Sequence, residues 1–275
     1  MLEIPEAVTI ARQIEERLSG RHVVSAVAAA FPHGFAWYFG DPAGYGALLA
    51  DRTVEGARAV GGMSEVMLDG VGMLFNDGAI PRYWPSGAKR PRKHQLLVEF
   101  DDGSALTCGI QMYGGIWAFP AGTRMNDYYD LAWTKPSPRT DAFTFDYFHD
   151  IVAQADAKLS AKALLATQQR IPGLGNGVLQ DILFQAGIYP KRKVQTLTDA
   201  DVEKLYNSIV HILRSMTNAG GRDVEKDFFG NPGGYKTILS RKTVGTPCPV
   251  CGQEIVKEPY LGGAIYFCPG CQPNA

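Results

Sequence analysis

One short stretch, residues 171–177, limits what this chain can fold into more than any other part of the sequence. It reads Ile-Pro-Gly-Leu-Gly-Asn-Gly, and its proline and three glycines interrupt a helix or a strand, so the chain must turn there. Apolar residues at helical spacing flank the turn on both sides, and Gly187 suits the C-terminal cap of the second segment. The sequence therefore predicts a helix, a tight glycine turn and a second helix. The flanking apolar residues are Leu164, Leu165, Val178, Leu179, Ile182, Leu183 and Ala186.

A glycine-rich turn before a helix presents backbone N–H groups at the positive end of the helix dipole, and such a site can bind phosphate. The spacing Gly173-x-Gly175-x-Gly177 resembles a dinucleotide-binding fingerprint, but that motif follows a strand, whereas a helix precedes this one. We therefore exclude a nicotinamide or flavin site. An ordinary corner between two helices, with glycines used only for turning, fits this stretch equally well.

The C-terminal segment carries two cysteine pairs. Cys248-x-x-Cys251 and Cys268-x-x-Cys271 are separated by sixteen residues, a spacing typical of a zinc ribbon, so we predict one structural Zn²⁺ held by four thiolates. Disulfides are the alternative, and a chain without a secretion signal disfavours them. The fifth cysteine, Cys108, is expected to be a small buried apolar residue in a strand.

Length and composition allow two domains of ordinary size. The chain has 275 residues, of which 45% are hydrophobic and 20% charged, as in soluble globular proteins. Neither a membrane span nor a signal peptide is visible, so we expect a cytoplasmic protein, and nothing indicates an oligomer. The net charge of −1 argues mildly against a protein that coats nucleic acid. The one basic cluster, residues 89–94, is on its own more typical of a solvated loop than of a nucleic-acid contact.

Along the chain, the pattern changes from strands to helices. Residues 3–20 have the spacing of a helix, and residues 22–121 contain short apolar runs separated by turns such as Asp101-Asp102-Gly103, which predicts a β-sandwich. Helices are predicted at 145–155, 161–169 and 199–218. The fold class is α+β. We predict a sandwich domain at 1–124, a linker at 125–141, a helical domain at 142–240 and a zinc ribbon at 241–275.

These features together resemble the formamidopyrimidine-DNA glycosylase and endonuclease VIII family. The resemblance rests on the N-terminal helix, the β-rich half, the glycine turn with its asparagine and the zinc ribbon, and its pieces extend from Glu3 to Gln272. It implies a helix-two-turn-helix motif and double-stranded DNA, damaged or distorted, as the partner. It also implies DNA contacts by the following residues, of which the asparagine would contact a phosphate. They are Asn176, Gly175, Lys93, His94, Tyr235 and Tyr113.

The family's catalytic group is missing. In the family, an N-terminal proline exposed by removal of the initiator methionine attacks the sugar C1′, expels the damaged base and, as an imine, drives strand cleavage. Here Leu2 takes that position, while Glu3 keeps the place of the following glutamate. A bulky second residue blocks methionine removal, so the free amine should belong to Met1. This amine would be one residue, or several ångströms, away from the position of the family's nucleophile, and a misplacement of roughly 1 Å can already lower a rate a hundredfold.

Other cations of the family are missing as well. The hairpin lysine falls on Met63 or Ser64, and the zinc-ribbon arginine corresponds to Gly263. The loop that fills the gap left by an extruded base corresponds to residues 109–114, where both arginines are absent although Tyr113 could still stack. Imine and lyase chemistry is therefore predicted to be weak or lost.

Three functions fit these observations. The first is a DNA glycosylase in which Glu3 activates water, although this carboxylate could equally just stabilise a helix N-terminus. The second is a catalytically inactive protein that binds damaged or structured DNA. The third is a zinc-ribbon interaction module that binds no nucleic acid.

Overall fold

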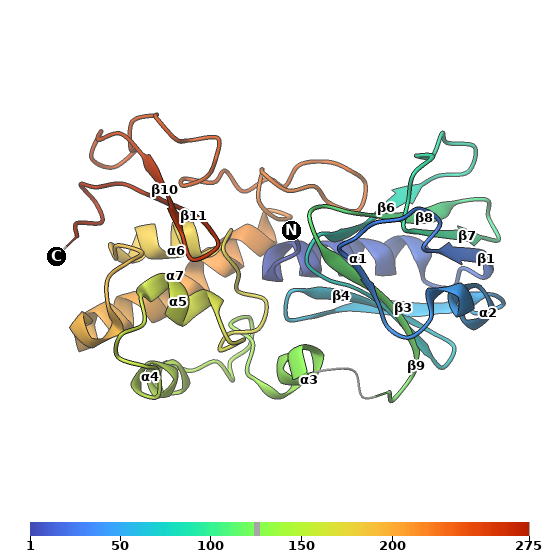
Figure 1. The fold of residues 1–275 in the computed structure, drawn as a ribbon, viewed down its shortest axis with the longest axis horizontal. Helices are drawn as coiled ribbons and strands as arrows, with labels where there is room; N and C mark the ends of the chain where they lie inside the picture. Colours follow the sequence, from blue (N-terminus) through green and yellow to red (C-terminus); the bar gives the residue numbers. More distant parts are fainter. Residues whose placement is uncertain (124–126, 275) are drawn as a thin grey trace.

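The computed structural model describes residues 1–123 and 127–274 and shows a β-rich half joined to a helical half. The N-terminal helix α1 begins at the junction and extends along the β-rich half (Figure 1). The third unit, a small two-stranded hairpin near the C-terminus, lies against α6. The elements in chain order are α1 (Ile4–Leu18), β1 (Val23–Ala28), β2 (Ala36–Tyr38), α2 (Tyr45–Leu49), β3 (Val54–Val60), β4 (Met63–Leu68), β5 (Val71–Phe75), β6 (Ala79–Trp84), β7 (Leu96–Phe100), β8 (Ala105–Ile110), β9 (Gly114–Pro120), α3 (Asp127–Thr134), α4 (Phe145–Ala153), α5 (Ala161–Ala166), α6 (Leu179–Ala186), α7 (Asp199–Asn218), β10 (Val256–Tyr260) and β11 (Gly263–Phe267).

The predicted sandwich is confirmed. One sheet has the strand order β1-β7-β8-β6 and the other β2-β9-β5-β4-β3, and all pairings in them are antiparallel except β2 with β9. Alternating side chains from both sheets form one apolar core, which also takes in residues of α1 such as Ile10 and Ile14. The turn predicted at 101–103 joins the antiparallel strands β7 and β8. Strands β3 and β6 and the short helix α2 were not predicted.

Helix α1 belongs to both halves of the molecule. Pro5 lies in its first turn, where a missing N–H costs nothing. Its apolar positions divide between two cores, because Ile10 and Ile14 pack into the sandwich whereas Ile4 packs among the helices of the C-terminal half. The first residues of the chain are thereby held at the junction of the two halves.

The helix–turn–helix prediction is confirmed, with one boundary wrong. The first helix, α5, ends at Ala166 and not at residue 169, because Gln168 and Gln169 adopt left-handed conformations with φ of 57° and 48° that no helix accepts. The second, α6, ends at Ala186, and its C-terminal cap Gly187 adopts the left-handed conformation, as the sequence predicts. Helix α7 was predicted with its observed bounds, and Thr198 and Asp201 form a capping box at its start.

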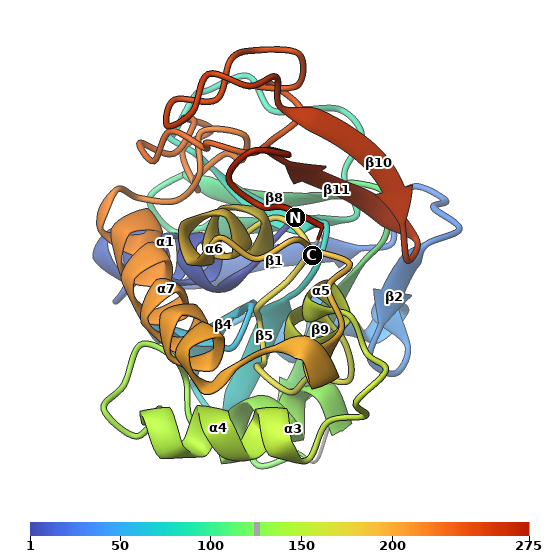
Figure 2. The same cartoon turned by 90° about the vertical axis from the view of Figure 1, so that its left-hand side faces the viewer.

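The predicted linker contains a helix. Residues 127–134 form α3, which lies with α4 on the side of the molecule away from β10 and β11 in both views (Figures 1 and 2). Residues 124–126, which include the predicted domain end and the start of the linker, lie outside the described part of the chain. The domain boundaries themselves stay predictions. Within residues 1–123 and 127–274, every helix is too short or too polar to cross a bilayer.

Candidate functional site

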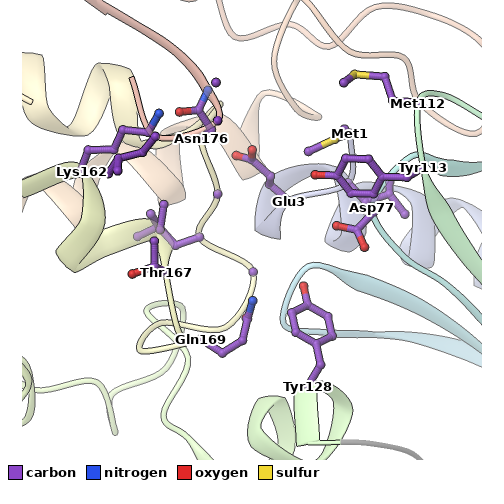
Figure 3. Close-up of a pocket in the computed structure, with 18 residues that line it drawn as sticks. Met1, Glu3, Asp77, Met112, Tyr113, Tyr128, Lys162, Thr167, Gln169 and Asn176 are labelled. Carbon is purple, nitrogen blue, oxygen red and sulfur yellow. The ribbon is translucent and has the colours of Figure 1, made fainter. Parts of the chain in front are cut away.

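A cavity of about 460 Å³ opens between the two halves and the ribbon hairpin (Figure 3). Its size is that of a pocket for a small molecule or a single base. Six segments line it: the N-terminus, Asp77 in the turn between β5 and β6, the turn between β8 and β9, Tyr128 of α3, the segment from α5 to the glycine turn, and the turn between β10 and β11. The predicted residues that it brings together are Leu2, Glu3, Tyr113, Gly175 and Asn176.

Glu3 is buried in the wall of this cavity and both of its carboxylate oxygens are engaged. Oε1 accepts a hydrogen bond from the backbone N–H of Gly177 and Oε2 one from Val178, each at 2.7 Å. These are the N–H groups that precede α6, so an anion does bind at this helix start. It is the protein's own carboxylate, so these two N–H groups are not free for a phosphate, which favours the alternative of an ordinary corner between two helices. A side chain on Gly175 would come within 2.6 Å of Glu3 Oε1, so the glycine leaves room for the carboxylate.

A buried arginine completes the cluster. The Arg222 guanidinium, 2% exposed, donates to both oxygens of Glu6 at 3.0 and 2.8 Å and lies 3.4 Å from Glu3 Oε2. Burial raises the pKa of Glu3, and the charge of Arg222 and the two N–H groups oppose that rise. The same two carboxylates raise the pKa of Arg222 despite its burial. This Glu3–Arg222–Glu6 cluster joins α1, the glycine turn and the loop after α7.

The first two residues of the chain are held by contacts with the rest of the molecule. The backbone N–H of Leu2 donates to the carbonyl of Asp77 at 2.6 Å, and the Leu2 side chain is 5% exposed within the sandwich core. The α-amino group of Met1 forms an ion pair with Glu225 at 2.7 Å. As Figure 3 shows, Met1 and Glu3 lie at the same edge of the cavity.

Asn176 and an unpredicted lysine face the ribbon hairpin. The Asn176 side chain donates to the carbonyl of Ala264 at 3.1 Å. Lys162 is 4% exposed and donates to the carbonyl of Tyr260 at 2.6 Å, and burial lowers its pKa. A Cβ on Gly263 would lie 3.5 Å from the Asn176 amide nitrogen and 3.6 Å from the Lys162 ammonium. Lys162 therefore places a cation beside Gly263, the position that corresponds to the zinc-ribbon arginine.

The sequence held one signal for Lys162 and none for Arg222. Lys162 is the single charged residue of α5, whose other residues are alanine and leucine, and a lysine that such an apolar helix buries needs a polar partner. Arg222 follows two glycines in a loop, where no periodicity marks burial.

The other predicted contacts lie elsewhere. Lys93 is exposed and His94 half-buried in the loop between β6 and β7, outside the cavity lining. Tyr235 is half-buried against the apolar core of the helical half, where burial and the charge of Asp181 raise the pKa of its hydroxyl. Tyr113 lines the cavity and packs against Trp37.

The four cysteines of the C-terminal pairs come together. Their sulfur atoms all lie within 4.8 Å of one another, at 3.7 Å for Cys248 and Cys271 and 3.3 Å for Cys251 and Cys268. Four thiolates at about 2.3 Å from a tetrahedral metal would be about 3.8 Å apart, so the set fits one metal ion. Burial opposes ionisation of Cys248, yet the N–H groups of Cys251 and Val250 lower its pKa to about 7. Cys108 is buried in β8, as predicted.

Sequence comparison places this architecture among known proteins. Residues 135–227 match the family model of the formamidopyrimidine-DNA glycosylase H2TH domain. The chain is 31% identical to the formamidopyrimidine-DNA glycosylase of Symbiobacterium thermophilum, over 99% of this chain and 90% of that protein. The chain belongs to the formamidopyrimidine-DNA glycosylase family. The glycosylase of Lactococcus lactis subsp. cremoris is a second relative, at 25% identity over 99% of both chains.

Solved structures agree on the fold of the family. The crystal structure of the MutM (Fpg) protein from Thermus thermophilus matches with a TM-score of 0.81 at 24% identity, over 99% of both chains. That of the Lactococcus lactis Fpg in complex with DNA containing an abasic site matches with a TM-score of 0.83 at 23% identity, over 99% of this chain and all of that one. The resemblance drawn from the motifs, and the α+β fold it implies, are confirmed.

Proposed function

We propose that this protein binds damaged or distorted double-stranded DNA across the cavity and does not carry out the imine and lyase chemistry of its family. The observation that carries the proposal is the state of Leu2, whose nitrogen is an amide bonded to Asp77 and whose side chain lies in the core. A nucleophile needs a free amine aimed at the sugar. With Met1 in place, the α-amine is that of Met1, and it is paired with Glu225.

DNA binding is supported by groups that remain on the other side of the cavity. Asn176 and Lys162 point toward it from the helical half (Figure 3), and Lys162 supplies a cation without a carboxylate partner among the described residues. A phosphate at the mouth would accept hydrogen bonds from both. The Lactococcus lactis relative has been solved with abasic-site DNA. We carry that partner class over to this chain, together with contacts from the loop of Lys93 and His94.

A salt titration tests this proposal. A duplex with a tetrahydrofuran abasic site should bind with a log-log salt slope that Lys162→Met lowers by about one. Lys204→Met is the matched control, because Lys204 is exposed on α7, away from the cavity lining, and should leave the slope unchanged. Failure of any duplex to bind at low salt would instead favour a protein-interaction role for the zinc ribbon.

Base excision with Glu3 as the water-activating group is the second candidate. It is favoured by the position of Glu3 in the cavity wall and by its raised pKa. Against it, both oxygens already accept backbone hydrogen bonds, which makes Glu3 a residue that positions the glycine turn. Release of an oxidised base from a duplex by wild type, lost in Glu3→Gln with folding intact, would establish the second candidate.

We further infer that the metal of the four cysteines is one structural Zn²⁺. Four thiolates are the donor set that zinc takes in closed structural sites, and such a site would fix the β10–β11 hairpin beside Asn176. We also propose the division into a sandwich domain, a linker, a helical domain and a zinc ribbon, and a cytoplasmic location.

A further inference from the structure

An exposed aromatic surface adjoins the cavity on the sandwich side. Trp37 is 47% exposed on β2, the edge strand of its sheet, and its ring packs on Tyr113 at 5.5 Å between centroids with an interplanar angle of 34°. Phe35 and Met112 beside them are 64% and 73% exposed. We call Phe35, Trp37, Met112 and Tyr113 the aromatic platform. Exposed apolar side chains gathered in this way mark binding surfaces.

The platform is continuous with the cavity and is held rigidly. Tyr113 and Met112 line the cavity themselves. The turn that carries them is fixed on Gly78, whose N–H donates to the Tyr113 carbonyl and whose carbonyl accepts from Gln111 N–H, both at 2.9 Å. Met112 keeps a left-handed φ of 63° in this turn, a conformation that costs a non-glycine residue energy and that the hydrogen bonds of the turn hold in place.

A second link ties β2 to the same turn. The N–H of Gly114 donates to the carbonyl of Phe35 at 3.1 Å, and Trp37 lies in register with Gly115 of β9. The chain that leads into β2 also touches the basic loop, because Phe31 packs on His94 at 6.0 Å between centroids. The platform thus lies between a cavity and a loop rich in lysine and arginine.

We propose that the aromatic platform is a stacking site for unpaired nucleobases of a DNA strand, centred on Trp37. Flat rings stack on aromatic side chains whatever the base, while neighbouring cations contact the backbone, and this combination is how proteins bind single strands. The inference rests on the proposed DNA-binding function and adds to it a preference for strands that carry unpaired bases next to the cavity.

Binding of the oligonucleotide (dT)12 and of a blunt duplex of the same length tests the platform. Trp37→Ala should weaken (dT)12 binding about tenfold, within the range that loss of one base–aromatic stack gives. Trp37→Phe should recover part of that loss. Trp133→Ala is the matched control, because Trp133 is 49% exposed on α3 and packs under Arg58, and it should bind (dT)12 as wild type does.

Tryptophan fluorescence provides the direct readout. Saturating (dT)12 should quench wild type and Trp133→Phe, and Trp37→Phe should lose most of the quenching. The platform is refuted if wild type does not bind (dT)12, if Trp37→Ala binds it unchanged, or if Trp37→Ala weakens duplex binding by the same factor. If wild type does not bind (dT)12, or if Trp37→Ala binds it unchanged, the proposed DNA-binding function would still hold as long as duplex binding depends on Lys162.

Discussion

The Glu3–Arg222–Glu6 cluster offers the sharpest test of how the cavity is held together. In Arg222→Met the side chain keeps much of its volume and loses its charge, which leaves two carboxylates, each 4% exposed, without a counter-ion. Glu6 loses both guanidinium hydrogen bonds and Glu3 loses the charge that opposes its burial. Because Glu3 also fixes the start of α6, the effect should spread to the glycine turn.

The magnitude follows from the burial. Removing one partner of a buried ion pair costs about 3–5 kcal/mol. A domain protein has about 5–15 kcal/mol of total stability, so Arg222→Met should lose a large part of it at neutral pH. Arg12→Met is the control, because Arg12 and its partner Glu16 are each 58% exposed and their ion pair should contribute less than about 1 kcal/mol.

The pH dependence has a definite sign. Burial raises the pKa of Glu3 and Arg222 lowers it, so removal of Arg222 raises it further. An acid whose pKa is higher in the folded state binds more protons when folded, so it contributes stability at low pH that is lost as the pH rises through the raised pKa. Arg222→Met should therefore recover part of its deficit as the pH is lowered from neutral through the raised pKa of Glu3, in urea unfolding followed by circular dichroism. Equal stability of wild type and Arg222→Met at neutral pH, or a deficit that does not shrink on acidification, would refute this reasoning.

Three further outcomes are expected. Leu2→Pro, with loss of the initiator methionine checked by mass spectrometry, should gain a borohydride-trapped adduct with abasic-site DNA, and its absence would mean that more than the nucleophile is missing. Elemental analysis should find one zinc per chain in wild type and none in Cys268→Ser, which should also have a lower melting temperature. Cys108→Ser, in β8, should keep the metal. Gly173→Ala should lower the free energy of unfolding by more than the roughly 1–2 kcal/mol that a left-handed alanine costs, because its Cβ would overlap the backbone of the β3–β4 turn. Gly245→Ala is the control, since Gly245 has a φ of 80° with open space around it and should lose only that amount. Equal losses in the two variants would contradict the close approach of Gly173 to the turn.

The sequence predicted the parts whose physics is local. The helix over residues 199–218 has helical apolar spacing, and the structure confirms its bounds. The cysteine pairs came together as their spacing predicts. The glycine turn was likewise recognisable, since proline and glycine restrict the backbone whatever the tertiary context.

What the sequence could not predict depends on contacts between distant segments. Glu3 bonds to Gly177 and Val178, more than 170 residues away, so its role as the anion at the start of α6 has no local signature. Arg222 is buried only because α1 brings Glu6 to it. Helix α5 ends early because of Gln168 and Gln169, both of which have ordinary helix propensity, so tertiary packing overrides the local preference.

Borohydride trapping of wild type on abasic-site DNA tests the central claim most directly. The α-amine of Met1 is paired with Glu225 and the nitrogen of Leu2 is bonded to Asp77, so we predict a salt-sensitive complex with this DNA and no covalent adduct after reduction. A trapped adduct that mass spectrometry maps to the N-terminus would contradict the account.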